Sequence, residues 1–144
     1  MKSIVVLAFF ITFQSILACD DGWLSYNGHC YLFSHDIQSW IGSEGVCFHF
    51  GAYLAEIDDN AEDMFLQNFV NMFAKTYWVG GTDLSNEGDW IWANSKKHFS
   101  RTYDRWQGNE PNNKHGLENC LMLGSFGWND STCPSQVNYI CEKN

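Results

Sequence analysis

Residues 110–130 have the sequence EPNNKHGLENCLMLGSFGWND. Five residues in it carry the carboxylate or amide oxygens that Ca²⁺ prefers, in a coordination shell of about six to eight ligands. They are Glu110, Asn112, Glu118, Asn129 and Asp130. Because three of the five are acidic, their carboxylates should repel one another, and the loop should be looser without a cation. The stretch therefore predicts a calcium site in a loop that the ion orders.

The first 18 residues have the composition of a secretory signal peptide. Lys2 precedes an apolar run from Ile4 to Ile11, and the small residue Ala18 stands before Cys19. An apolar core of about ten residues is too short for a membrane span, which needs about 20, and no later segment is long enough. We therefore expect cleavage after Ala18, no membrane anchor, and one secreted domain over residues 19–144.

The chain is acidic and rich in aromatic residues. Its net charge is −9, and loss of Lys2 with the signal peptide leaves seven basic against seventeen acidic side chains, or −10. This balance argues against nucleic acid as a partner, although solvated surface accounts for most of the acidic residues. Aromatic residues make up 17% of the sequence and only two prolines occur, which predicts a densely packed module without a Pro-rich linker.

Six cysteines lie after the signal peptide. They are Cys19, Cys30, Cys47, Cys120, Cys133 and Cys141. In an oxidising compartment they predict three disulfides, and their spacing alone does not choose among the fifteen pairings that six cysteines allow. No two of them have the Cys-x-x-Cys spacing of a zinc knuckle, so a structural zinc site is disfavoured.

Two helices are expected in the first half of the domain. After short strands over residues 23–33 with a turn at Asn27-Gly28, an apolar stripe predicts a helix over residues 37–50 that ends at Gly51. A second helix should start with Asn60 as its N-cap. Its predicted core face consists of Phe65, Phe69, Met72 and Phe73.

The second half of the domain has the pattern of short strands. These are expected over residues 77–79, 90–92, 119–123 and 137–141. Four tryptophans in this half are interpreted as packing residues and not as sugar-stacking platforms: Trp78, Trp90, Trp92 and Trp128. The stretch from Ala93 to Glu118 has little periodicity, which is unusual in a compact domain unless the loop is functional.

Four landmarks in this order resemble the C-type lectin domain. They are Trp78-Val79-Gly80-Gly81, then Glu110-Pro111-Asn112, then Trp128-Asn129-Asp130 between Cys120 and Cys133, and finally Cys141. The resemblance implies an α+β fold with two helices, two small antiparallel sheets and a long calcium-binding loop region. It also implies three disulfides, Cys19–Cys30, Cys47–Cys141 and Cys120–Cys133.

The same resemblance assigns roles to the five oxygen donors. It makes Glu110, Asn112, Glu118, Asn129 and Asp130 ligands of one Ca²⁺ and of the carbohydrate, with a cis Glu110-Pro111 bond. A second calcium site would use Asp83, Glu87, Asn113 and Asn119, with a share of Glu118. Because Asn113 and Asn119 are amides where two-site lectins carry acids, we expect the second ion to bind more weakly. Trp106 and His115 lie close enough in sequence to the loop to touch the sugar.

A Glu-Pro-Asn order resembles lectins that prefer sugars with equatorial 3- and 4-hydroxyls, such as mannose. The predicted function is a secreted, calcium-dependent lectin for mannose-type glycans in innate immunity or other extracellular recognition, with homo-oligomers for avidity. Two alternatives stay open: a protein- or mineral-binding module of the same fold, and a lectin with galactose-type specificity. A glycosidase that pairs Glu110 with Glu118 would leave the amides unexplained, so no enzyme is predicted.

Overall fold

The computed structural model describes residues 19–99 and 103–144, so the predicted signal peptide lies outside the described residues. The elements follow in the order β1 (Leu24–Tyr26), β2 (His29–Phe33), α1 (Trp40–His49), β3 (Tyr53–Leu54), α2 (Asn60–Phe73), β4 (Tyr77–Thr82), β5 (Ile91–Trp92), the 3₁₀ turn η1 (Lys114–Gly116), β6 (Cys120–Gly124), β7 (Gly127–Ser131) and β8 (Asn138–Lys143). Neither helix in the described ranges is long and apolar enough to cross a membrane.

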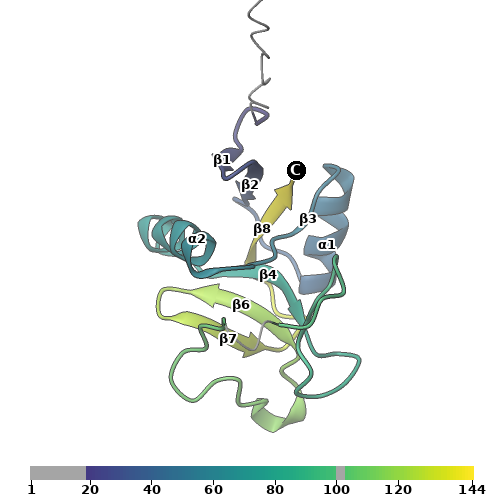
Figure 1. Cartoon of the computed structure of the whole chain (residues 1–144). Helices are drawn as coiled ribbons and strands as arrows, with labels where there is room; N and C mark the ends of the chain where they lie inside the picture. The colour runs from purple at the N-terminus through teal and green to yellow at the C-terminus, as the bar shows by residue number, and fades with distance from the viewer. Residues whose placement is uncertain (1–18, 100–102) are drawn as a thin grey trace, which may run out of the picture.

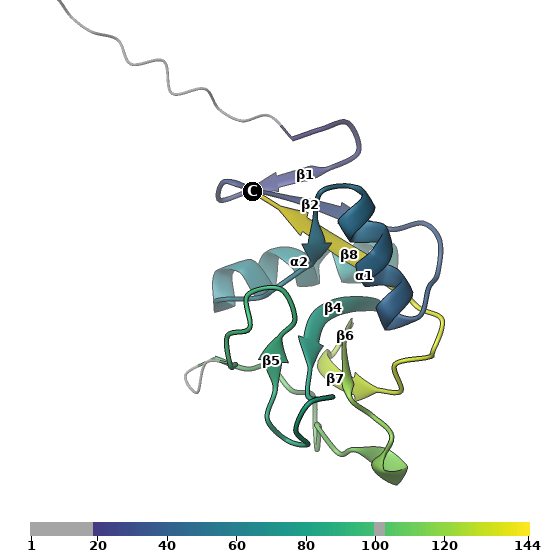
Figure 2. The ribbon, with the colours of Figure 1, turned by 90° about the vertical axis from the view of Figure 1, so that its right-hand side faces the viewer.

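The strands form two antiparallel groups joined at their centre. The order through both groups is β1-β2-β8-β4-β6-β7, with β3 paired to β8 and β5 paired to β4 (Figure 2). The join is a short parallel pairing of β4 with β8, in which Tyr77 lies opposite Asn138. The predicted α+β fold with two helices is confirmed, and the two expected sheets are continuous through this join.

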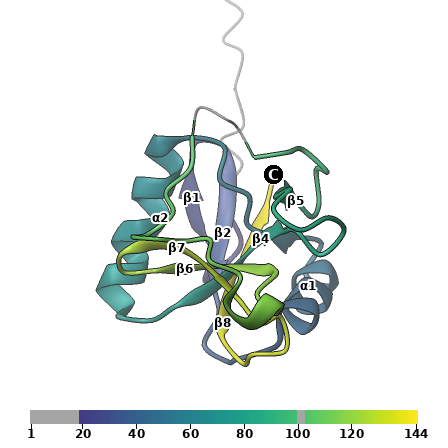
Figure 3. The same ribbon diagram turned by 90° about the horizontal axis from the view of Figure 1, so that it is seen from below.

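The helices flank the strands, and the long loop lies at one end of the domain. Figures 1 and 3 show α1 and α2 on opposite sides of the strands. The C-terminus lies at the end of the domain that carries β1 and β2, whereas η1 and the segments around it lie at the other end. This arrangement places the predicted calcium loop far from the point where the chain enters the domain.

The N-terminal hairpin and the disulfides agree with the predictions. Asn27 and Gly28 have φ angles of 47° and 85°, the left-handed conformation that a two-residue hairpin turn requires. The three disulfides are Cys19–Cys30, Cys47–Cys141 and Cys120–Cys133. The first closes the hairpin, the second joins α1 to β8, and the third braces the start of β6.

Helix α1 lies within the predicted range 37–50 but starts three residues later, at Trp40, because Gln38 forms a β-bridge with Val137. Its predicted apolar stripe is only partly buried, since Phe48 is 82% exposed. Ser39 caps α1, and Gly51 follows its end with a φ of +66°.

The N-cap of α2 differs from its prediction by one residue. In α2 the N-cap is Asp59, whose carboxylate accepts a 2.9 Å hydrogen bond from the Glu62 amide. The prediction of Asn60 as the cap was therefore wrong: both residues are good caps, and Asp59 is the one with extended backbone.

The buried face of α2 is also different from the predicted apolar stripe. Its buried residues are Asp63, Leu66, Gln67 and Val70. Met72 is 70% exposed, and Phe65 and Phe69 only pack against the edge of the core. The apolar pattern missed this face because two of its four buried residues are polar.

Strand β4 is buried on both faces, and its glycines permit close approach of neighbouring segments. A Cβ atom on Gly80 would lie 2.7 Å from the carbonyl oxygen of Leu54, and one on Gly81 would lie 2.6 Å from Leu121 Cδ2. The indole of Trp40 donates to the carbonyl of Val79 at 2.9 Å, which fixes α1 to this strand. The Trp-Val-Gly-Gly landmark therefore has a packing explanation.

The tryptophans predicted to pack are buried. Trp78 and Trp128 are fully buried, and Trp90 and Trp92 are 7% and 3% exposed. Strands β3 and β7 were not among the predicted strands. The first has only two residues, and the second contains glycine, asparagine and aspartate, residues that strands usually avoid.

Candidate calcium and carbohydrate site

Asp130 joins the Glu-Pro-Asn segment to the β6–β7 hairpin. Its carboxylate is fully buried on β7 and accepts hydrogen bonds from two backbone amides, that of Asn112 to Oδ1 at 3.2 Å and that of Asn113 to Oδ2 at 2.7 Å. Two residues of the loop are thus held on the strand that carries two predicted ligands. The Cys120–Cys133 disulfide braces the same hairpin.

Glu110 lies beside this buried carboxylate and has an unsatisfied oxygen. Its Oε2 is buried and has no hydrogen-bond partner among the described residues. Burial, and then the neighbouring Asp130 carboxylate, raise the pKa of Glu110 above its usual value. An orphaned carboxylate oxygen next to a second carboxylate is an environment that a cation would stabilise, so these residues fit a calcium ion.

The two amides predicted as ligands have different contacts, and no hydrogen bond among the described residues joins Asn129 to Glu110 or Asn112. The amide of Asn112 lies next to the Glu110 carboxylate and partly offsets the rise in its pKa. Asn129 donates from Nδ2 to the backbone carbonyl of Asp130 at 2.8 Å. With its nitrogen turned to that carbonyl, the side-chain oxygen of Asn129 remains available to a ligand. The Glu110-Pro111 bond is cis, as expected.

Glu118 is held by a different part of the loop. Its Oε2 accepts a 3.0 Å hydrogen bond from the Lys114 amide, and its own amide donates to Asn113 Oδ1 at 3.1 Å. These contacts fold residues 113–118 around the η1 turn. Among the described residues no hydrogen bond joins Glu118 directly to Glu110 or Asp130, so its part in one ligand set stays a prediction.

Three of the four residues predicted for a second calcium site converge. One terminal atom of the Asn119 amide lies 3.0 Å from Asp83 Oδ1 and 3.2 Å from Glu87 Oε2, and as nitrogen it donates to both carboxylates. Burial, together with the charges of Glu87 and Asp130, raises the pKa of Asp83. The amide therefore occupies the position between two acids where a cation would otherwise lie. Asn113 is not part of this group, because its backbone and side chain bind Asp130 and Glu118.

No three acidic, histidine or cysteine side chains converge in metal-binding geometry within residues 19–99 and 103–144. A calcium ion at either place would therefore need amide oxygens beside the carboxylates, as the sequence predicts. This composition lowers the negative charge at the site, and it suits the modest affinity of extracellular calcium modules.

Asp63 supports the site and was not predicted from the sequence. Its carboxylate accepts a 2.7 Å hydrogen bond from Trp128 Nε1 and forms a 3.0 Å ion pair with Arg105 Nη1. The apolar pattern of α2 does not predict that this acid is buried. Its spacing from Leu66 and Val70, at i+3 and i+7, is the signal that could have placed it on the buried face.

Trp106 and His115 differ in their surroundings. The ring of Trp106 packs 4.9 Å from that of Trp90 and 5.9 Å from that of Trp128, so it forms part of an aromatic cluster beneath the loop. His115 is exposed in the η1 turn with a φ of 59°. His115 is thus exposed, whereas Trp106 is half-buried and lines a surface pocket together with Trp90 and His98.

Comparison with known proteins decides the family. The model described as the lectin C-type domain matches residues 36–143. The chain belongs to the C-type lectin family. It is 36% identical over 130 residues to a perlucin-like protein of Mytilus galloprovincialis, which covers 85% of this chain and 81% of that protein. It is 30% identical over 149 residues to a C-type lectin mannose-binding isoform of Notechis scutatus scutatus, which covers 97% of this chain and 92% of the relative.

Solved C-type lectin structures share the fold. The carbohydrate-recognition domain of cow CD23, crystallised in the presence of a GlcNAc2Man3 oligosaccharide, matches with a TM-score of 0.79 at 30% identity over 88% of this chain and 95% of that chain. This C-type lectin chain thus has a carbohydrate-recognition fold and belongs to a family of glycan-binding proteins, not to an enzyme family.

Proposed function

We propose that this C-type lectin is a secreted, calcium-dependent receptor for mannose-type glycans, as in innate immune recognition. The observation that carries the proposal is the buried, unpartnered Oε2 of Glu110 beside the buried carboxylate of Asp130. Two acidic groups in such proximity are costly unless a cation or a proton compensates them. In the proposal, the amides of Asn112 and Asn129 would complete a donor set of hard oxygens.

Five residues would hold the ion and the sugar in this proposal. They are Glu110, Asn112, Glu118, Asn129 and Asp130. Bound calcium would supply positions for two vicinal hydroxyls of the sugar. The carboxylates of Glu110 and Glu118 would accept hydrogen bonds from those hydroxyls, and the amides of Asn112 and Asn129 would donate to them.

The order of acid and amide supports the choice of sugar. Glu110 before Pro111 and Asn112 after it matches the arrangement of lectins that bind equatorial 3- and 4-hydroxyls. The relative from Notechis scutatus scutatus is named a mannose-binding isoform, and the cow CD23 domain was crystallised with a mannose-containing oligosaccharide. A single site of this kind is shallow, so we expect weak binding per site and a need for multivalent display or homo-oligomers.

A binding assay with calcium and a chelator tests the proposal. Binding to a glycan array should be strongest for mannose-type ligands in calcium and absent in EDTA. The Glu110→Gln variant should lose at least about tenfold in affinity, a loss of 1.4 kcal/mol or more. The control is Glu44→Gln, which removes a carboxylate from α1 and should bind as the parent protein does. Full binding in EDTA would contradict calcium dependence.

A second variant tests sugar preference separately. Exchanging acid and amide in Glu110→Gln/Asn112→Asp should weaken mannose binding and favour galactose. A parent protein that prefers galactose would support the galactose-type alternative.

The acidic composition of the protein supports one alternative function, binding to a protein or a mineral. With a net charge of −9, the protein could meet a cationic protein or a mineral face through its carboxylates. The test is binding to calcium carbonate. Binding that persists in competing mannose and in the Glu110→Gln variant would favour a protein- or mineral-binding module over the lectin.

A further inference from the structure

A pocket lies between the N-terminal hairpin and the end of α2, separate from the calcium loop. It has a volume of about 220 Å³, and the residues that line it include Leu24, Phe33, His35, Phe73, Lys75 and Tyr77. They come from β1, the end of β2, the end of α2 and the start of β4. None of them belongs to either predicted calcium site.

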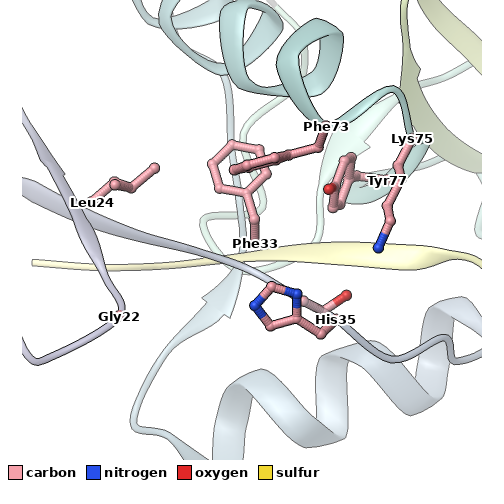
Figure 4. Close-up of a pocket in the computed structure, with 8 residues that line it drawn as sticks. Gly22, Leu24, Phe33, His35, Phe73, Lys75 and Tyr77 are labelled. Carbon is pink, nitrogen blue, oxygen red and sulfur yellow. The ribbon is translucent and has the colours of Figure 1, made fainter.

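Aromatic rings form the wall of this pocket. The ring of Phe33 meets that of Tyr77 edge-to-face at 5.2 Å and that of Phe73 at 5.6 Å. Figure 4 shows Phe73 reaching down from α2 to Phe33, with Leu24 on the far side. Edge-to-face pairs expose ring faces and edges to which a further aromatic ring can pack.

Lys75 brings a positive charge to the rim. Helix α2 ends at Phe73, and its C-cap residue Ala74 has left-handed backbone with φ 51°, so that Lys75 turns away from the helix axis. The Lys75 side chain runs from there toward the part of the chain that carries His35 (Figure 4). Among the described residues Lys75 forms no ion pair, although the protein has a net charge of −9. An anion at the rim would therefore meet an uncompensated ammonium group.

Tyr77 adds a polar group inside the pocket. The residue is 1% exposed, and its hydroxyl points toward Phe33 and Phe73 (Figure 4). Burial alone raises the pKa of Tyr77, and no hydrogen bond from the described residues contributes. A hydroxyl that lines the pocket and makes no hydrogen bond to the described residues is a position where a ligand can gain one.

We propose that this pocket binds a small molecule in which an aromatic ring carries a short chain with an anionic group. The ring would pack between Leu24, Phe33 and Phe73, and the anionic group would pair with Lys75 at the rim. The size is suitable, because an apolar cavity of about 150 Å³ holds a benzene molecule. One oxygen of the anionic group would accept the hydrogen bond of the Tyr77 hydroxyl.

Other occupants suit the pocket less well. An organic cation would be repelled by Lys75, and a purely apolar molecule would leave both Lys75 and the Tyr77 hydroxyl without a partner. A second copy of the chain also has a net charge of −9, so the two copies would repel each other.

A titration monitored by protein NMR tests the proposal with 3-phenylpropionate as the probe. The full domain is labelled with ¹⁵N and titrated in calcium and again in EDTA, without sugar. Shifts should centre on residues 22–24, 33–35 and 73–77 and be the same in both buffers. The neutral analogue 3-phenylpropanamide should bind about tenfold more weakly, because it lacks the charge-assisted contact with Lys75.

Variants separate the charge from the fold. Lys75→Met keeps an apolar stem of similar length. It should weaken the binding of 3-phenylpropionate about tenfold and have little effect on the binding of 3-phenylpropanamide. Lys97→Met is the matched control on another surface loop and should bind as the parent does. Tyr77→Phe should weaken the binding of 3-phenylpropionate several-fold while leaving the fold intact.

Four results would overturn the proposal. The first three are the absence of shifts at millimolar probe, shifts that lie on another face of the domain, and equal binding of the carboxylate and the amide. Tighter binding of octanoate than of 3-phenylpropionate would also contradict it, because it would identify an acyl-chain site in place of an aromatic one. None of these results depends on calcium or mannose binding.

Discussion

The indole Nε1 of Trp128 donates a 2.7 Å hydrogen bond to Oδ1 of Asp63, a carboxylate that is fully buried on α2. The other oxygen of Asp63 accepts from Arg105 Nη1 at 3.0 Å. One acidic side chain thus ties the helix to the loop segment and to β7, the strand of Asn129 and Asp130. Buried hydrogen-bond networks of this kind fix the orientation of the segments that they join. The position of Asn129 and Asp130 therefore depends on α2, a helix outside the site.

Replacing Asp63 should therefore destabilise the whole domain. Asp63→Ala leaves a buried indole donor and a guanidinium without their partner, and we expect a loss of about 3 kcal/mol in the free energy of unfolding. Asp63→Asn keeps an acceptor for Trp128 and should lose about 1–2 kcal/mol. Urea unfolding in excess calcium measures both values. Asp21→Ala, which removes an exposed acid, should change stability by less than about 0.5 kcal/mol; an equal loss in all three variants would contradict the network.

Calcium should stabilise the domain through the Glu110 and Asp130 pair. If the ion binds with a Kd of about 10⁻⁴ to 10⁻³ M, 10 mM calcium should add about 1.4–2.7 kcal/mol relative to EDTA. Differential scanning calorimetry in calcium, magnesium and EDTA measures this difference. Most of it should disappear in Glu110→Gln and persist in Glu44→Gln. The same stabilisation by magnesium as by calcium would argue against a site of this donor set.

Most of the fold can be predicted from the sequence because it follows from local turn residues or from regularly spaced apolar residues. The Asn27-Gly28 turn, the strands around buried tryptophans and the end of α1 at Gly51 all follow from backbone preferences and apolar patterns. The disulfide pairing came only from the family resemblance. Patterns fail where a buried residue is polar, and for this reason Asp63 was assigned no buried role and Met72 was placed on the wrong face.

Part of the candidate site could not be predicted from sequence patterns, because it depends on contacts between residues that lie far apart in the chain. The sequence names the oxygen donors, but not which of them meet. Glu110 and Asp130 lie twenty positions apart and come together because Asp130 accepts the amides of Asn112 and Asn113. Glu118 is bound instead to its own turn, a contact that depends on the backbone course of residues 113–118.

An acid at position 119 should create a stronger second calcium site. The Asn119 amide now bridges Asp83 and Glu87, and it can satisfy both carboxylates without an ion. In Asn119→Asp these hydrogen bonds are replaced by a third negative charge, which only a cation can compensate. We expect titration calorimetry to find one more bound calcium per chain than in the parent protein, and a larger fall in stability in EDTA.

The control for this prediction is Asn68→Asp, an amide on the exposed face of α2. It adds the same charge without facing another acid, and it should leave the calcium stoichiometry unchanged. If Asn119→Asp and Asn68→Asp gave the same calcium binding, the amide bridge would not be what limits the second site.

A pH-dependent contribution to stability should come from Glu62, away from both calcium sites. Its carboxylate accepts hydrogen bonds from the Tyr31 hydroxyl and from the Asp58 amide. Burial raises the pKa of Glu62 despite these bonds; the charge of Asp58 adds to the rise, and His29 opposes it. The folded protein therefore holds this proton to a higher pH than the unfolded chain does, and Glu62 lowers stability as pH rises above about 4.5.

Glu62→Gln removes that titration, so its stability relative to the parent should improve between pH 4.5 and neutral pH. We expect a gain of about 0.5–1 kcal/mol, kept small by solvent screening at this partly buried side chain. The lost carboxylate hydrogen bond costs the same at every pH and cancels when differences between pH values are compared. Urea unfolding at a series of pH values, in constant excess calcium, measures the effect. A stability difference between parent and Glu62→Gln that stays constant with pH, or a variant that loses stability relative to the parent as pH rises, would show that Glu62 ionises at least as easily in the folded protein as in the unfolded chain.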